Sequence, residues 1–155
     1  MATLNVTITE SLTINGKDQG GTYSGFSNSS ITQCEKRQIN VTTTEVTLYA
    51  AADAQASGTG GAIWDDDSVK YVRITNLAAN SNHIIIVVKN ADNDEFLYKL
   101  FGTESLLLYR HDGAMHAKEG SATAIGEVAS IDLVTAQAVS STQAVELFIA
   151  STNAA

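Results

Sequence analysis

The sequence predicts an all-β protein, an antiparallel β-sandwich of jelly-roll type with roughly ten short strands. Apolar and polar residues alternate with a period of two over segments of strand length. Turn signals recur about every 8 to 12 residues. Charged residues make up 17% of the chain against 44% hydrophobic residues, and serine, threonine, asparagine and glycine make up most of the remainder, as is typical of strands with polar outer faces. Because 155 residues suffice to bury a core, we expect one domain over residues 1–155.

The N-terminal segment predicts a strand and a tight turn. Over TLNVTIT, residues 3–9, apolar residues alternate with polar ones, which indicates a half-buried strand. Asn15-Gly16 follows, and this dipeptide is the strongest short-range signal for a hairpin turn. Residues 18–30, DQGGTYSGFSNSS, contain three glycines, so we expect a loop or an irregular edge there.

The next stretch, from residue 29 to 50, predicts further strands. It fits either two strands, at 30–34 and 37–41, or one long bent strand, followed by a strand over 44–50. Small residues and glycine then interrupt the pattern in AAADAQASGTGG, residues 50–61. We expect an exposed loop there, which is a candidate for contacts with another molecule because it exceeds the usual connection length.

The centre of the chain has the strongest strand pattern. SVKYVRITN, residues 68–76, places Val69, Tyr71, Arg73 and Thr75 on one face and Lys70, Val72 and Ile74 on the other. HIIIVVKN, residues 83–90, is apolar on both faces and is expected deep in a sheet. The connection LAANSN is short and polar, so we predict that the two strands pair as a hairpin.

Two more strands are expected at 95–101 and 106–110, with turns at 92–95 and 102–105. The last two are predicted over VASIDLVTA, residues 128–136, and AVELFIAS, residues 144–151. Alanine, glutamate and glutamine also favour helix in this region, but the β-branched residues at 131–135 and the turn-like SST favour strands. The chain has no proline, a residue that often prevents edge strands from pairing with another molecule. Charge, loops or a neighbouring subunit must therefore protect the edge strands from such pairing.

Charge and cysteine content exclude several classes of protein. A formal charge of −8 and a pI near 4.6 disfavour nucleic-acid binding, which needs clustered lysine and arginine; the pair Lys36 and Arg37 is too small a cluster. Cys34 is the single cysteine, so neither an intramolecular disulfide nor a thiolate zinc site is expected. No apolar run reaches the length of a membrane span, and the N-terminus lacks the pattern of a signal peptide. We therefore expect neither nucleic-acid nor membrane partners.

Catalytic motifs are absent from the sequence, and we predict no enzyme, no catalytic residue and no cofactor. RHDGAMH, residues 110–116, holds His111 and His116 at a spacing that does not fit a cupin metal site, and His83 opens an apolar strand. No GxSxG elbow occurs, and Cys34 has no catalytic signature. Gly-rich SGTGG is not followed by the GK[ST] of a phosphate-binding loop.

Acidic turns are the weak candidates for a metal site. WDDD and DNDE flank the central strands, and hard cations such as calcium take oxygen ligands from loops. However, consecutive aspartates on an extended chain point to alternate sides, and neither loop has calcium-loop spacing. Solvated turn carboxylates are the favoured interpretation. The candidate residues are Asp65, Asp66, Asp67, Asp92 and Asp94.

The lone Trp64, taken together with the tyrosines, admits two interpretations. An aromatic face can stack on a sugar, which would suit a carbohydrate-binding β-sandwich used for host attachment. Core packing or a subunit contact is favoured because this tryptophan stands beside the start of a strand.

Several segments together resemble one family. LNVTITESLTINGKDQGGT, KRQINVTTTEVTLYA, VKYVRITNL followed by IIIVVKN, and the closing VELFIAS resemble small structural proteins of tailed bacteriophages, particularly marine and cyanobacterial phages. Such proteins are often capsid decoration, or cement, proteins.

This resemblance implies a non-enzymatic jelly-roll protein made in the host bacterial cytoplasm and placed on the outer surface of the virion's capsid. It implies binding to the major capsid protein and to copies of itself, often as a homotrimer, so that neighbouring capsid subunits are bridged. A tail or baseplate component of the same virion would share these features. The carbohydrate-binding β-sandwich remains the alternative from a different class.

Overall fold

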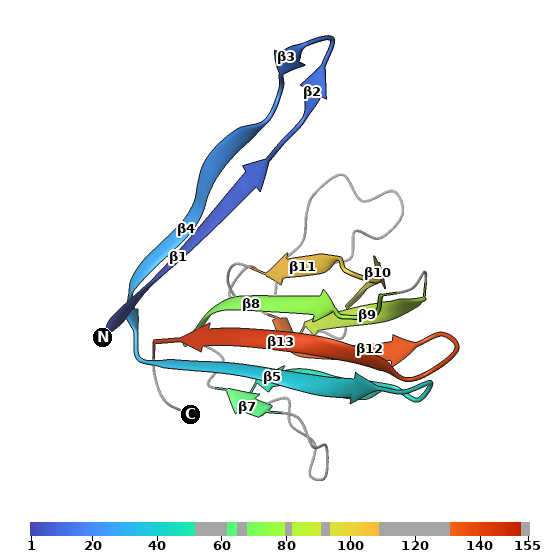
Figure 1. Cartoon of the computed structure of the whole chain (residues 1–155). Helices are drawn as coiled ribbons and strands as arrows, with labels where there is room; N and C mark the ends of the chain where they lie inside the picture. The colour runs from blue at the N-terminus through green and yellow to red at the C-terminus, as the bar shows by residue number, and fades with distance from the viewer. Residues whose placement is uncertain (52–61, 65–67, 80–81, 91–93, 109–130, 153–155) are drawn as a thin grey trace, which may run out of the picture.

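The computed structural model (Figure 1) is all-β. It describes residues 1–51, 62–64, 68–79, 82–90, 94–108 and 131–152. Within these ranges no helix is long and apolar enough to cross a membrane. Most of the predicted loop at 50–61 lies outside the described residues, and so do His111 and His116.

Two sheets pack face to face as a β-sandwich, which confirms the predicted class. The five-stranded sheet has the order β10-β9-β12-β6-β7. In the same order, its strands span Glu95–Phe101, His83–Asn90, Ile131–Ala138, Val46–Ala51 and Ala62–Trp64. The four-stranded sheet has the order β11-β8-β13-β5. In the same order, its strands span Ser105–Leu108, Val69–Asn76, Gln143–Ser151 and Gln33–Val41. Neighbouring strands are antiparallel, except that β6 and β7 run parallel.

The core lies between the two sheets and is built from alternate residues of their strands. Each sheet contributes aliphatic side chains with no exposed surface, so the two inner faces exclude water together. The fully buried aliphatic members are Val41, Leu48, Val69, Ile74, Ile84, Ile86, Leu100, Val134, Ala136, Val145, Leu147 and Ile149.

A long hairpin projects from this sandwich (Figure 1). It is formed by β1 (Ala2–Glu10) and β4 (Gly21–Ile31), paired antiparallel from Ala2↔Ile31 to Glu10↔Gly21. Two short strands, β2 (Thr13–Ile14) and β3 (Lys17–Asp18), form its tip. We call residues 2–31 the arm. The nine residues of β1 span about 30 Å at strand rise.

The strand order follows a simple nested rule. β5 pairs with β13, β6 with β12, β8 with β11, and β9 with β10. If these eight strands are numbered along the chain, the first therefore pairs with the last, and so on inward to the adjacent fourth and fifth. β7 is an addition at the end of the five-stranded sheet.

The structure corrects one prediction and decides between the alternatives of two others. β8 and β9 do not form a hairpin: β8 pairs with β11 and β13, whereas β9 pairs with β10 and β12. Their inner faces, with Ile74 and Ile84 buried, meet from opposite sheets, so the chain changes layers between the end of β8 and the start of β9. Residues 18–30 were expected to form a loop or an irregular edge, and the second alternative fits: they are mostly strand β4, whose pairing with β1 contains two register irregularities. The region from residue 29 to 41 holds two strands and not one long bent strand. The break lies at Thr32, between the end of β4 and the start of β5, so residues 33–41 form one continuous strand.

Candidate interaction surfaces

The arm's shaft is open to solvent on both faces. Beyond Val6 on β1 and before Phe26 on β4, every residue of the arm is exposed except Gly20 and Gly21. Four large apolar side chains lie in this exposed part, with exposed fractions of 36%, 52%, 51% and 57% for Ile8, Leu12, Ile14 and Tyr23. Only Glu10, Lys17 and Asp18 carry charge between residues 2 and 31, so the shaft is a nearly neutral surface of hydroxyl, amide and apolar groups.

Local sequence explains why the arm forms a hairpin. Asn15 and Gly16 both have positive φ angles, 53° and 74°, which is the backbone of a two-residue type I′ turn and confirms the predicted turn. Asp18 Oδ1 accepts a 2.8 Å hydrogen bond from the Gly20 amide. A side chain on Gly20 would collide with the carbonyl oxygen of Glu10, so glycine lets the two strands approach closely there.

The arm's base is fixed to the outer face of the four-stranded sheet by aromatic contacts. The Tyr71 ring stacks on Phe26 of the arm, with 6.3 Å between centroids, and meets Phe148 edge-on at 5.9 Å. Tyr71 is buried. These rings form a second, smaller core; its other members are Leu4, Val6, Ile31, Leu107 and Ala150.

A cavity of about 350 Å³ opens where the arm leaves the sheet. One wall is the arm and the other is the outer face of β5, β8 and β13. Its lining residues are Leu4, Asn5, Val6, Thr7, Lys36, Tyr71, Arg73 and Phe148.

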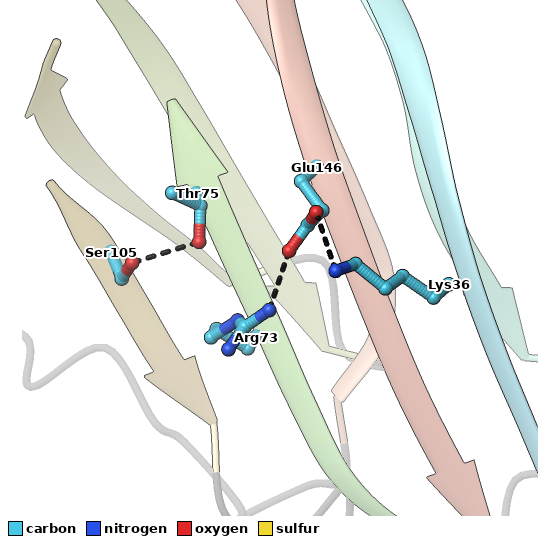
Figure 2. A network of polar contacts seen from close by, with 5 residues as sticks. All are labelled: Lys36, Arg73, Thr75, Ser105 and Glu146. Atoms are coloured by element: carbon cyan, nitrogen blue, oxygen red, sulfur yellow. Dashed lines mark hydrogen bonds and ion pairs between the residues drawn. The ribbon is translucent and has the colours of Figure 1, made fainter. Parts of the chain in front are cut away.

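A polar network borders this cavity (Figure 2). Glu146 of β13 accepts a 2.5 Å bond from Arg73 Nη2 and lies 3.0 Å from Lys36 Nζ, so one carboxylate links β5 and β8. The hydrogen bond from Lys36, followed by the charges of Lys36 and Arg73, lowers the pKa of Glu146 below its ordinary value, although partial burial opposes the shift. Farther out on the face, the hydroxyls of Thr75 and Ser105 lie 2.8 Å apart.

The outer edge of the five-stranded sheet is a further apolar surface. β10 exposes Phe96, Leu97, Tyr98 and Phe101, with exposed fractions of 47%, 60%, 39% and 41%. No described strand pairs with this edge. Glu95 forms a 2.8 Å ion pair with Lys89 of β9, which raises the pKa of Lys89. The Lys99 ammonium lies 4.8 Å from the centroid of the Phe101 ring.

The aspartates that the sequence suggested as weak metal-site candidates belong to none of these surfaces among the described residues. Asp65, Asp66, Asp67 and Asp92 lie outside the described residues. Asp94 closes the β9–β10 turn: its amide donates to Asn90 Oδ1 at 2.7 Å, and its carboxylate accepts from Asn90 Nδ2 at 3.0 Å. Across the described ranges no group of three His, Cys, Asp or Glu could hold a metal.

Aromatic and basic candidates also have structural positions. Trp64 is 2% exposed and packs in the main core, so it offers no sugar platform. His83 packs against Phe101 with 5.4 Å between ring centroids. Lys36 joins the polar network, whereas Arg37 donates to the Leu48 carbonyl at 3.0 Å. Cys34 is exposed.

Neither the arm nor the β10 edge was identified as an interaction surface from the sequence. The signal for the arm was the Asn-Gly turn placed midway between two segments of strand length and very low charge. No protein-family model, curated protein or solved structure matches the chain.

Proposed function

We propose that this chain is a virion structural protein, a capsid decoration protein that binds the outside of a phage head and stabilises the shell by bridging capsid subunits. Its partners would be the major capsid protein and, on the assembled shell, copies of itself in a homotrimer. The observation that carries the proposal is the arm, which projects from the sandwich with both faces uncovered in the single chain.

The arm's stability argues that another surface covers it. A two-stranded hairpin in water is marginal on its own, and this one contacts the sandwich only through its base among the described residues. Burying a fully exposed large apolar side chain contributes about 1.5–3 kcal/mol, and the four side chains of the arm, which are 36–57% exposed, would each contribute about half of that. Covering Ile8, Leu12, Ile14 and Tyr23 therefore offers several kcal/mol toward docking, from which the cost of association is subtracted.

The chemistry of the arm indicates the kind of surface that it fits. A nearly neutral hairpin, with two edges that no described strand pairs, suits strand addition to a neighbour's sheet or an apolar groove, where backbone hydrogen bonds supply affinity in the first case. Docking of this kind depends little on ionic strength, because few charges take part.

The sandwich supports the proposal at the level of the fold. We infer that it is a jelly roll, because the nested pairing of the first strand with the last, the second with the seventh and so on describes a long hairpin rolled into two sheets. Viral capsid domains use this architecture, as do lectins and cupins, so the fold favours a virion role by analogy alone. The carbohydrate-binding alternative loses Trp64 from its aromatic platform, because that residue is buried.

The proposal is tested by counting copies on particles. Particles of the encoding phage are purified on a density gradient and separated into heads and tails, and each fraction is quantified by mass spectrometry against labelled peptides. We expect the chain in the head fraction at a constant ratio to the major capsid protein. Recovery with tails would favour the tail or baseplate alternative, and absence from all particle fractions would exclude a virion role.

A further inference from the structure

We propose that the outer edge of β10 is a self-association site, where the β10 strand of a second copy pairs antiparallel across a two-fold axis at Leu97. This inference goes beyond the proposed function and does not depend on it, because it concerns two copies of the purified chain.

The backbone of β10 defines where a partner strand can bind. Along an antiparallel pair, residues alternate between bonding the neighbour and pointing away from it. Asn90 of β9 donates its amide to the Asp94 carbonyl at 3.2 Å, so even-numbered residues of β10 bond β9. The amides and carbonyls of Glu95, Leu97 and Lys99 therefore point to the open edge.

One end of this edge is closed by the chain itself. The Phe101 amide donates to Glu104 Oε2 at 3.0 Å, and the Phe101 carbonyl accepts from the Glu104 amide at 3.2 Å. Phe101 thus cannot pair with another strand without losing these bonds. The available edge is the five-residue stretch Glu95–Lys99, and Leu97 is its centre.

The side chains of this stretch are complementary to themselves. Read from either end, EFLYK places a charged residue, an aromatic residue and then the central leucine, with opposite charges at the two ends. Pairing around Leu97 sets Glu95 opposite Lys99 twice, Phe96 opposite Tyr98 twice, and Leu97 opposite itself. Opposite charges and aromatic pairs facing each other across strands are stabilising.

Neighbouring registers lack this complementarity. The two-fold axis must pass beside a residue and not between two residues, because only then do the side chains of opposed residues lie on the same face of the joined sheet. Centring on Tyr98 would set Lys99 opposite Leu97, and centring on Lys99 would place two ammonium groups face to face, which is destabilising. The Leu97 register also continues a charge row, because Lys89 already pairs with Glu95 and the partner's Lys99 would lie on its other side.

The contact is expected to be weak in dilute solution and stronger on a crowded surface. Five residues per strand give an interface smaller than a standard one, so dimerisation should depend on concentration. Copies held side by side on a particle would experience a far higher effective concentration. A two-fold contact of this kind would tie decoration proteins to each other as well as to the shell.

Charge reversal with complementation tests the pairing. Sedimentation velocity from about 10 µM to about 1 mM should show wild-type chain shifting from monomer to dimer. E95K alone and K99E alone create two like-charge pairs, so each should weaken dimerisation at least about tenfold. An equimolar mixture of E95K and K99E restores both opposite pairs and should recover the heterodimer. K17E, which makes the same charge change as K99E on the arm, should leave dimerisation unchanged.

Cysteine cross-linking tests the register. In a Cys34→Ser background, Leu97→Cys places two thiols at a directly opposed pair, where the Cα separation of about 5.5 Å allows a disulfide. Mild oxidation should give covalent dimer for this variant, and little for Tyr98→Cys, which the register sets beside Phe96. A wild-type chain that stays monomeric throughout the concentration range, or a dimer that K99E leaves intact, would overturn the proposal.

Discussion

Arg73 and Glu146 form a 2.5 Å ion pair between β8 and β13, directly beside the cavity under the arm. Glu146 also holds Lys36 of β5 at 3.0 Å. A single carboxylate therefore joins three adjacent strands on the face from which the arm rises, and it neutralises one of two cations placed close together. This network lies on the face of the sandwich that carries the arm's base, and two of its members, Lys36 and Arg73, line the cavity beside the arm.

Removing the Glu146 charge should destabilise the chain in a pH-dependent way. Glu146→Gln leaves Lys36 and Arg73 without the anion between them, so the melting temperature should fall at pH 7. The pKa of Glu146 is lowered from an ordinary value of 4.5, chiefly by the hydrogen bond from Lys36. Its stabilisation is therefore present above the ordinary value and is lost as the pH falls through the lower folded-state pKa.

Thermal melts of both proteins between about pH 7 and about pH 3 check this expectation. The difference between wild type and Glu146→Gln should be largest near neutral pH, should shrink below pH 4.5, and should decrease at high salt. Glu10→Gln, which removes an exposed carboxylate from the arm, serves as the control. An equal and pH-independent effect of both substitutions would contradict a stabilising role for the network.

The centre of the sandwich should tolerate truncation poorly. Leu147 has no exposed surface and packs between the sheets, so Leu147→Ala should lower the free energy of unfolding by about 2–5 kcal/mol. Val139→Ala, at a position 55% exposed, should change it by less than about 0.5 kcal/mol. Urea unfolding measures both. Similar costs for the two variants would show that the core does not lie where the structure places it.

Tyr71 should control how firmly the arm is held. Tyr71→Ala removes the ring that stacks on Phe26 and meets Phe148, so the arm's base loses its anchor. Amide hydrogen exchange in β1 and β4 should accelerate by about tenfold or more, since local opening of a poorly packed hairpin requires little free energy. Protection in β9 and β12, which lie in the other sheet, should persist in the folded variant. Unchanged protection in the arm would argue that other contacts fix it.

The tip of the arm should depend on Gly20. Gly20→Ala sets a methyl group against the Glu10 carbonyl, so the strands must separate there. We expect faster amide exchange around β2 and β3 with little change in the unfolding midpoint of the sandwich, because the tip makes no contact with the main core. Ser24→Ala, also on the arm and exposed, is the matched control. A large loss of global stability in Gly20→Ala would mean that arm and sandwich fold as one unit.

Strand positions could be predicted from sequence wherever one face is buried. The period of two in β8 correctly separated Val72 and Ile74, which face the main core, from Tyr71, Arg73 and Thr75. Val69 was assigned to the wrong face, because a register irregularity between Val69 and Tyr71 turns it into the core. The last segments form β12 and β13 and not a helix, as their β-branched residues indicated.

Strand partners and the arm could not be predicted in the same way. Alternation specifies the face of a strand but not its neighbour, so the short connection between β8 and β9 suggested a hairpin where the chain changes sheets. The start of β4 was not recognised as a strand because residues 21–25 carry no apolar stripe; this part is held by pairing with β1, whereas Phe26 and Ile31 are packed in the second core. The acidic turns were candidates for a metal site because of their composition alone. Asp94, the described member, is a turn residue whose amide donates to Asn90.

The most direct test of the proposed function is a cryo-electron microscopy reconstruction of the assembled particle. The account predicts density for the sandwich on the outer surface of the head, with residues 7–25 of the arm covered by a neighbouring subunit. A map that places the chain on the head with the arm extended into solvent, or that contains no density for the chain, would contradict the claim that the arm is its docking element.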